Sequence, residues 1–296
     1  MPQEYPIILR GFPGTVRLEE GIEYARGLKA DVYIPVEAQK PVPTILFLHA
    51  GGWLHGDRKL GPDLGRFFTQ RGFAMVSIDY RLSNEALFPA PVHDVKTAVR
   101  WIRARAGEYG FDPNRIGIWG LSAGGHLATL AAISTDSDFV SDDDPYREFS
   151  SAVQAVVAGY PPVDFNQFAA DEGSFEAKLL GSPLSTVPEL VRQANPAAYV
   201  KGLGAPPILL VHGSDDKVVP SSQSELLFDA LGVAGNNVTM FLIEGLGHGF
   251  MNKNDFDQGE FKRVKKYECR GGEPPVITDA PPFMFGTVET FFRRNL

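Results

Sequence analysis

Hydrophobic residues along this chain fall into two alternating patterns. Short continuous apolar runs are separated by longer stretches in which apolar residues recur at helical spacing, and the runs are 44–48, 73–78, 115–119, 152–158, 207–211 and 238–243. Continuous runs of this length are typical of strands buried on both faces, as in parallel sheets covered by helices. The alternation therefore predicts repeated strand–helix units and an α/β fold with a mostly parallel central sheet.

The stretches between the runs predict the covering helices. Residues 64–71 are expected to form a short helix that ends at Gly72, and residues 91–109 a longer one that ends before Gly110. A third helix directly follows a glycine-rich turn, and residues 283–294 predict a closing helix. The pattern indicates a single domain over residues 1–296, with helices on both faces of the sheet.

Two segments depart from this strand–helix alternation. Residues 164–205 contain several glycine and proline breakers and two short helical patches, at 175–180 and 188–193, and we expect them to form a small cap over a site. Residues 252–275 are polar, carry two pairs of adjacent basic residues and make a long connection for an α/β unit. We expect this second segment to be a solvated surface excursion.

Charge and cysteine content narrow the classes of partner. The formal net charge of -8 argues against nucleic acid or an anionic membrane surface, because neither attracts a net-negative protein. Cys269 is the only cysteine, so neither an intrachain disulfide nor a cysteine metal cluster can form. The first residues lack the basic and apolar regions of an export signal, so we expect a cytoplasmic protein, or a secreted one if such a signal has been removed.

A serine occupies the apex of the glycine-rich turn. Ser122 lies between the run 115–119 and the helical stretch 126–132, with Gly120 and Gly124 two residues away on each side. A nucleophile held in a strained strand-to-helix turn leaves no room for side chains beside it, so this composition indicates a catalytic serine. A glycine–serine turn without chemistry is the simpler alternative, but the flanking strand and helix favour the nucleophile.

The base and acid that would activate this serine follow two later strands. A serine hydroxyl needs a general base, and the base needs an acid to orient it. The fifth apolar run leads into a turn with Asp215 and Asp216; we choose Asp216, although composition alone leaves Asp215 as a rival. The last run leads into a glycine-rich loop that contains His248, which we assign as the base. The order serine, aspartate, histidine is that of the α/β-hydrolases.

Backbone donors for an oxyanion are expected in two places. The negative charge of a tetrahedral intermediate requires converging N–H groups. The loop after the first apolar run supplies Gly51 and Gly52, with the Trp53 N–H as a further candidate, and Ala123 supplies the N–H that follows the nucleophile. The ring of Trp53, together with Tyr160 and the cap, is a candidate for the substrate pocket.

The remaining histidines do not suggest a metal site. His126 follows the nucleophile by one helical turn, and we expect it to pack against neighbouring strands. No pair of histidines has a zinc-ligand spacing such as H-E-x-x-H. We therefore expect catalysis without a metal and without a cofactor.

The motifs together resemble the bacterial carboxylesterases of the α/β-hydrolase superfamily, and more closely their feruloyl-esterase-like branch, which is related to hormone-sensitive-lipase-like esterases. The similar segments cover most of residues 16–251 and are His49-Ala50-Gly51-Gly52-Trp53, Asp79-Tyr80-Arg81-Leu82, Gly120-Leu121-Ser122-Ala123-Gly124-Gly125-His126, His212-Gly213-Ser214-Asp215-Asp216-Lys217-Val218-Val219-Pro220 and Gly247-His248-Gly249. The resemblance implies the α/β-hydrolase fold and supports Asp216, the fifth residue of the H-G-x-x-D string. The chain departs from the family at Ala50, where a glycine is usual, and in the length of 252–275.

Members of the family hydrolyse short acyl esters, some of them acetyl or hydroxycinnamoyl groups on plant polysaccharides. The resemblance thus implies a serine carboxylesterase whose partner is a small-molecule or carbohydrate-linked ester, with a homo-oligomer as one expected state. Arylformamidases share a related glycine–tryptophan loop, and prolyl-oligopeptidase-like peptidases share the H-G-x-x-D string, so both stay open. A non-catalytic binding receptor is a third alternative, although it would be expected to lack a triad residue.

Overall fold

One sheet organises the whole fold in the computed structural model, which describes residues 3–5, 15–168, 173–259 and 262–296. Its strands are β1 (Gln3–Tyr5), β2 (Val16–Ala25), β3 (Leu28–Pro35), β4 (Val42–Leu48), β5 (Ala74–Ile78), β6 (Phe111–Leu121), β7 (Ala155–Gly159), β8 (Ile208–Gly213), β9 (Val238–Ile243), β10 (Val264–Cys269) and β11 (Val276–Ala280). Their order across the sheet is β1-β2-β3-β5-β4-β6-β7-β8-β9-β10-β11.

The centre of the sheet is parallel. Strands β5, β4, β6, β7, β8 and β9 each run parallel to their neighbours in this group. The pairs at both margins are antiparallel. The predicted, mostly parallel sheet is confirmed, and it comes from the continuous apolar runs. Strands β2 and β3 were not among the predicted strands, because polar and apolar positions mix along β2 where one of its faces meets solvent.

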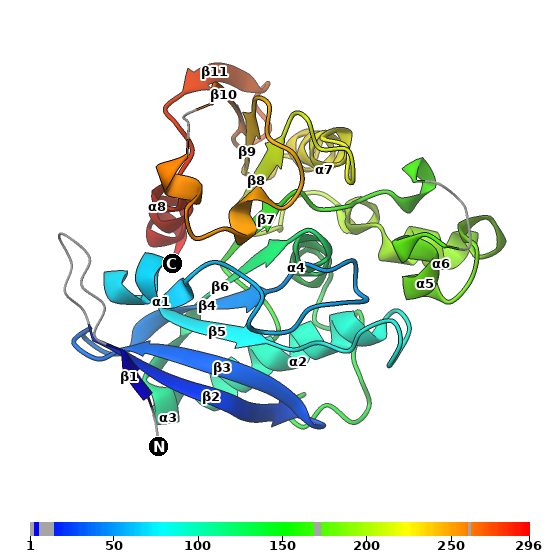
Figure 1. Cartoon of the computed structure of the whole chain (residues 1–296). Coiled ribbons are helices and arrows are strands. Elements are labelled where there is room, and N and C mark those ends of the chain that lie inside the picture. Colours follow the sequence, from blue (N-terminus) through cyan, green and yellow to red (C-terminus); the bar gives the residue numbers. More distant parts are fainter. Residues whose placement is uncertain (1–2, 6–14, 169–172, 260–261) are drawn as a thin grey trace.

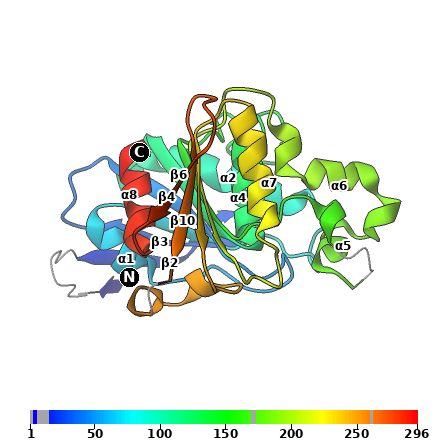
Figure 2. The same cartoon turned by 90° about the horizontal axis from the view of Figure 1, so that it is seen from above.

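Helices cover both faces of this sheet, as predicted (Figures 1 and 2). They are α1 (Leu64–Phe67), α2 (Ala90–Ala104), α3 (Ala106–Tyr109), α4 (Ala123–Ile133), α5 (Phe175–Leu180), α6 (Pro188–Ala194), α7 (Ser222–Val233) and α8 (Phe285–Asn295). Figure 2 shows α1 and α8 on one face and α2, α4 and α7 on the other. Each face has its own apolar core, with Phe67 and Phe292 in one and Val99 and Leu127 in the other.

Most described residues of the segment 252–275 are exposed, as its polarity predicts, but the segment also contributes a strand to the sheet. Its second half forms β10, which pairs antiparallel with β9 from Val264 opposite Ile243 to Cys269 opposite Val238. Val264 and Cys269 are buried, whereas Lys265 between them is exposed. The basic residues concealed the strand because Lys265 and Lys266 interrupt its apolar pattern, although β10 is paired on both sides, with β9 and with β11.

The segment 164–205 leaves the sheet between β7 and β8 and carries α5 and α6. Both helical patches form, and Figure 2 shows them beyond the helices of the α4 face. Helix α5 begins where the Ser174 side chain accepts a hydrogen bond from the Ala177 N–H, and it ends at Gly181 with a left-handed φ of 73°. Pro188 begins α6, a position where its missing N–H is not needed.

Candidate active site

The turn between β6 and α4 holds Ser122 in a strained conformation. Its φ is 53° and its ψ is -118°, a region that costs about 1–3 kcal/mol for a residue other than glycine. A Cβ on Gly120 would lie 2.0 Å from the Gly124 carbonyl oxygen, and one on Gly124 would lie 2.3 Å from the Leu48 carbonyl oxygen. Only glycine fits on either side, so the composition noticed in the sequence has a steric cause. The Ser122 N–H donates to the Gly159 carbonyl at 2.8 Å, which ties the turn to β7.

Three residues that are far apart in the sequence form one relay. The distance from His248 Nε2 to Ser122 Oγ is 2.8 Å, and the distance from His248 Nδ1 to Asp216 Oδ2 is 2.6 Å. Because the carboxylate accepts a hydrogen bond from Nδ1–H, Nε2 carries no proton and can accept the proton of the serine hydroxyl. The residues follow β6, β8 and β9, whose carboxyl ends meet at one edge of the parallel sheet.

The choice between the two adjacent aspartates is decided by their environment. Asp215 is exposed, and its carboxylate accepts a hydrogen bond from the Ser214 hydroxyl. Asp216 is buried, and its Oδ1 accepts the N–H groups of Val218 and Val219, each at 2.9 Å. The structure therefore places Asp216, and not Asp215, at His248.

A second histidine supports the acid. His212 is fully buried, its Nε2 lies 2.8 Å from the Val219 carbonyl oxygen, and the same atom is 3.4 Å from Asp216 Oδ2. Burial works to raise the pKa of Asp216, but hydrogen bonds from His212, His248 and the Val219 N–H outweigh it and hold the pKa well below its ordinary value. The carboxylate is therefore ionised at neutral pH. His212 had no predicted role; it lies four residues before Asp216, and the turn after β8 brings the two side chains together.

Three backbone N–H groups stand free beside the serine. Among the hydrogen bonds of the described residues, none uses the N–H of Gly51, Gly52 or Ala123, and all three residues line the same cavity as Ser122. Gly51 has a φ of 130°, and a Cβ there would lie 1.9 Å from the His55 carbonyl oxygen, so the loop requires glycine. The arrangement gives the cavity donors for an oxyanion.

The loop before these glycines is held by Tyr80. The rings of His49 and Tyr80 stack with centroids 4.3 Å apart, and the Tyr80 hydroxyl donates to the His49 carbonyl at 2.9 Å. His49 Nδ1 in turn donates to the Ala50 carbonyl at 2.7 Å. Ala50 has no positive φ, so alanine replaces the usual glycine here without backbone strain. The departure at Ala50 leaves the loop intact.

The cavity over the serine has a volume of about 460 Å³. Its walls come from the 49–53 loop, from Ser122, Val219 and His248, and from the segment 164–205, which contributes Phe168, Ser174, Phe175 and Glu176. This segment was expected to form the cap, but none of these four residues was predicted individually. Phe175 could have been singled out, since a large apolar residue at the start of a short helix between breakers has little core to fill.

The two aromatic candidates for the pocket differ. Trp53 borders the cavity, but its side chain is almost fully buried, edge-on to His126 and close to Phe165, so direct contact with a substrate stays a prediction. Tyr160 does not line this cavity: its fully buried ring lies 4.7 Å from the His248 ring, centroid to centroid. Tyr160 directly follows the last residue of β7, and from there its ring packs edge-on against the ring of His248.

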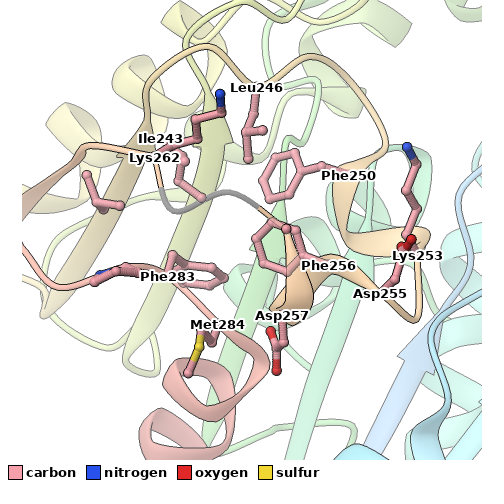
Figure 3. A pocket seen from close by; sticks show the side chains of 13 residues that line it. Ile243, Leu246, Phe250, Lys253, Asp255, Phe256, Asp257, Lys262, Phe283 and Met284 are labelled. Carbon is pink, nitrogen blue, oxygen red and sulfur yellow. The ribbon is translucent and has the colours of Figure 1, made fainter.

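A second cavity of about 270 Å³ is bordered by Leu246 and Phe250, which lie on either side of His248 in the sequence (Figure 3). Its walls include Phe250, Phe256 and Phe283, and no described residue lines both cavities. The ring of Phe250 lies 5.2 Å from Tyr160 and 5.2 Å from Phe256. The loop that contains His248 therefore packs against successive aromatic rings, those of Tyr160, Phe250 and Phe256.

Two further features concern the described residues only. They contain no group of three or more His, Cys, Asp or Glu side chains placed to hold a metal ion. Across the same residues, every helix is too short or too polar to cross a bilayer.

The sheet order, the turn at Ser122 and the relay define an α/β-hydrolase. The BD-FAE family model matches residues 30–231, more than half of the chain, and the chain belongs to this family, a feruloyl-esterase-like branch of the α/β-hydrolase carboxylesterases. The expected fold and family resemblance are thereby confirmed.

Known proteins similar to this chain carry esterase names. Esterase LipC of Mycobacterium tuberculosis is 34% identical over 218 residues, which cover 71% of this chain and 54% of LipC. The chain thus spans about half the length of that curated relative. A truncated carbohydrate esterase from gut microbiota superposes with a TM-score of 0.72 at 31% identity, covering 81% of this chain and 90% of that one. The propionate-bound esterase Est2 of Thermogutta terrifontis gives 0.64 at 26% identity, covering 79% and 85%.

Proposed function

We propose that this protein is a serine carboxylic ester hydrolase for short acyl esters, with acetyl or hydroxycinnamoyl esters of carbohydrates as the substrate class. The observation that carries the proposal is the relay of Ser122, His248 and Asp216, which opens on a cavity with three free N–H donors. The esterase names of the relatives, and the carbohydrate esterase among the structural neighbours, support an ester as the substrate.

The reaction proceeds in two halves. Ser122 Oγ attacks the ester carbonyl carbon while its proton passes to His248 Nε2, and the N–H groups of the oxyanion hole stabilise the tetrahedral oxyanion. His248 then gives the proton to the leaving alcohol, and the acyl group stays on Ser122. A water molecule loses a proton to His248 and attacks this acyl group; the carboxylic acid leaves as Ser122 regains its proton. Asp216 stays ionised and stabilises the imidazolium throughout.

The position of Phe175 in the cap favours substrates with a small acyl group. A Cβ on Gly52 would lie 2.6 Å from the Phe175 ring, so this ring rests directly on the oxyanion loop. A carbonyl oxygen placed at Gly51 and Gly52 therefore has the ring of Phe175 beside its acyl chain. A long chain would have to displace the ring, and a cavity of about 460 Å³ has room for a short acyl group with part of its alcohol.

The experiment compares esters with the two alternative amide classes. p-Nitrophenyl esters from acetate to palmitate, methyl ferulate and acetylated xylo-oligosaccharides are assayed beside an aryl formamide and a proline amide, with Ser122→Ala as the control. Cleavage that depends on Ser122 and declines with acyl length supports the proposal. Preference for the formamide or the proline amide would instead support an arylformamidase or a peptidase, and a folded protein that cleaves none of them would support a receptor.

A further inference from the structure

Three buried rings meet where the oxyanion loop, the nucleophile helix and the cap come together. They belong to Trp53, His126 and Phe165, and their centroids are 5.2 Å, 5.5 Å and 5.1 Å apart in pairs. Their exposed fractions are 1%, 0% and 0%. Each ring comes from a different part of the fold, so the cluster is a joint between these parts.

His126 adds a directional bond to this joint. Its Nε2 lies 2.6 Å from the carbonyl oxygen of Ala194, the last residue of α6. Because a carbonyl oxygen only accepts, Nε2 carries the proton and the ring is tied to the cap. The expectation that His126 packs against neighbouring strands did not include this hydrogen bond, which reaches across to α6.

The joint also carries polar atoms that a purely apolar core would lack. Nδ1 of His126 and Nε1 of Trp53 are both buried, and neither has a partner among the described residues. Burying such atoms unpaired is unfavourable, and an apolar residue of similar size would avoid it. The imidazole is therefore expected to stabilise the folded protein less than an apolar side chain of similar size would. The bond from its Nε2 to Ala194 is the contact that such a side chain could not make.

We propose that His126 is a positioning residue that holds the cap in register with both sides of the oxyanion hole. Ala123 begins the helix that carries His126 one turn later, and Gly52 directly precedes Trp53. The ring thus joins Ala194 of the cap to the two segments that supply the donors. This inference rests on the proposed function, because the effect of His126 on the oxyanion hole is measured through the rate of ester hydrolysis.

The same helix offers a matched control. Thr129 is as buried as His126, but its hydroxyl donates only to the Gly125 and His126 carbonyls of its own helix. Thr129→Val removes a buried polar group from α4 without touching the cap. His126→Leu removes the bond to Ala194, and His126→Gln offers a side-chain N–H that can replace it.

Steady-state kinetics with p-nitrophenyl acetate and p-nitrophenyl hexanoate test the proposal. In His126→Leu we expect kcat to fall about tenfold or more for both esters, because a misplaced oxyanion donor affects every substrate. The KM should rise further for hexanoate than for acetate, because the longer chain reaches the cap. His126→Gln should recover most of kcat. Unchanged constants in His126→Leu, or an equal loss in Thr129→Val at a matched Tm, would overturn the proposal.

Two measurements on the folded protein test the joint without relying on activity. In wild-type protein labelled with 15N-histidine, His126 should be a neutral Nε2–H tautomer that does not titrate between about pH 5.5 and 8. Amide exchange over residues 188–199 should speed up in His126→Leu and stay near the wild-type rate in His126→Gln and in Thr129→Val. A ring that titrates in that range, or exchange that is unchanged in His126→Leu, would contradict the joint. A wild-type protein without esterase activity would refute the proposed function while these two measurements still test the joint.

Discussion

Two glycine-rich turns carry Ser122 and His248, the proposed nucleophile and base, and they use glycine for different reasons. In the nucleophile turn, residues 120–125, a Cβ on Gly120 or Gly124 would strike backbone atoms at 2.0 Å and 2.3 Å. In the histidine loop, residues 244–250, a Cβ on Gly245 would meet nothing within 4 Å, and one on Gly247 would have its nearest neighbour at 3.9 Å. The first turn needs glycine for space, whereas in the second Gly245 and Gly249 have left-handed φ values of 73° and 80°, which glycine adopts without strain.

The difference shows how each catalytic side chain is held. Ser122 is fixed by the backbone, because close packing around its turn allows one conformation. His248 is fixed by its side-chain partners, the carboxylate of Asp216 at 2.6 Å and the ring of Tyr160 at 4.7 Å. Substitutions should therefore act through the backbone at one turn and through side-chain contacts at the other.

Removing the side chain of Ser122 or of His248 should have the same effect on kcat, although the two turns hold them differently, because the relay acts as a unit. Ser122→Ala and His248→Ala should each lower kcat on p-nitrophenyl acetate by on the order of a million-fold. The control is Ser221→Ala, at an exposed hydroxyl that pairs with Glu225. A loss of only tenfold in Ser122→Ala would show that another residue is the nucleophile.

Substitution of Asp216 tests the side-chain contact that holds His248. Asp216→Asn should lower kcat by about ten-thousand-fold, because an amide N–H facing Nδ1 favours the tautomer that cannot accept the serine proton. Asp215→Asn changes the exposed neighbour and should leave kcat near the wild-type value. Equal losses in both variants would mean that the acid is wrongly assigned.

Space at the nucleophile turn is tested by Gly124→Ala. The added methyl would lie 2.3 Å from the Leu48 carbonyl oxygen, so β4 and α4 must move apart. A shift of about 1 Å in Ser122 is expected to reduce kcat about a hundred-fold, together with a lower Tm. Wild-type kcat and Tm in this variant would contradict the steric account.

The helix after the nucleophile also predicts a pH dependence of folding. Burial lowers the pKa of His126 to about 4, although its bond to Ala194 works in the opposite direction. In the unfolded chain the pKa is about 6.5, so as pH falls from 6.5 to 4 the unfolded state binds a proton that the folded state does not. Stability from this group is thus complete above about pH 6.5 and lost on acidification, on the order of 3 kcal/mol in all.

Urea denaturation at pH 7, 5.5 and 4.5 measures this loss, and His126→Gln should lose less stability over the same range. His49 and His93 also have lowered pKa values, mainly from burial, but they are present in both proteins and cancel in the comparison. Parallel losses in the two proteins would show that His126 does not titrate as described.

The smallest effect is expected at the histidine loop. Gly247→Ala adds a methyl group to open space at a residue without a positive φ, so stability should stay within about 0.5 kcal/mol of wild type. We expect kcat within about threefold of wild type. A loss comparable to that of Gly124→Ala would remove the distinction between the two turns.

The features that sequence predicted best depend on local constraints. The strand from Val238 to Ile243 was predicted with its observed bounds, because its apolar run is continuous and ends at a glycine loop. The turn at Ser122 was predicted equally well, because the lack of space around it requires a glycine two residues away on each side, and both glycines can be recognised in the sequence. Strand β10 was missed because its exposed lysines match a loop as well as a sheet margin.

Side-chain partners were harder to predict because they depend on distant contacts. Tyr160 was considered for the pocket and supports His248 instead, and His126 was expected at the sheet and bonds to the cap. His212 and Phe175 had no assigned role before the fold placed them at Asp216 and Gly52. Three of these contacts join segments tens of residues apart, so the partner cannot be read from neighbouring residues, whereas His212 lies four residues before Asp216 and the turn between them brings the two side chains together.

The sequence by itself determined the alternation of strands and helices, the parallel centre of the sheet, the serine turn and the candidates for base and oxyanion donors. Those features follow from periodicity and from the space around a backbone, which neighbouring residues report directly. The tertiary structure placed Asp216 rather than Asp215 at His248, as the family resemblance had favoured, and it alone placed the Phe175 ring against Gly52 and joined His126 of α4 to Ala194 of the cap. Such choices depend on which surfaces meet when the layers pack, and that is a property of the whole chain rather than of any segment.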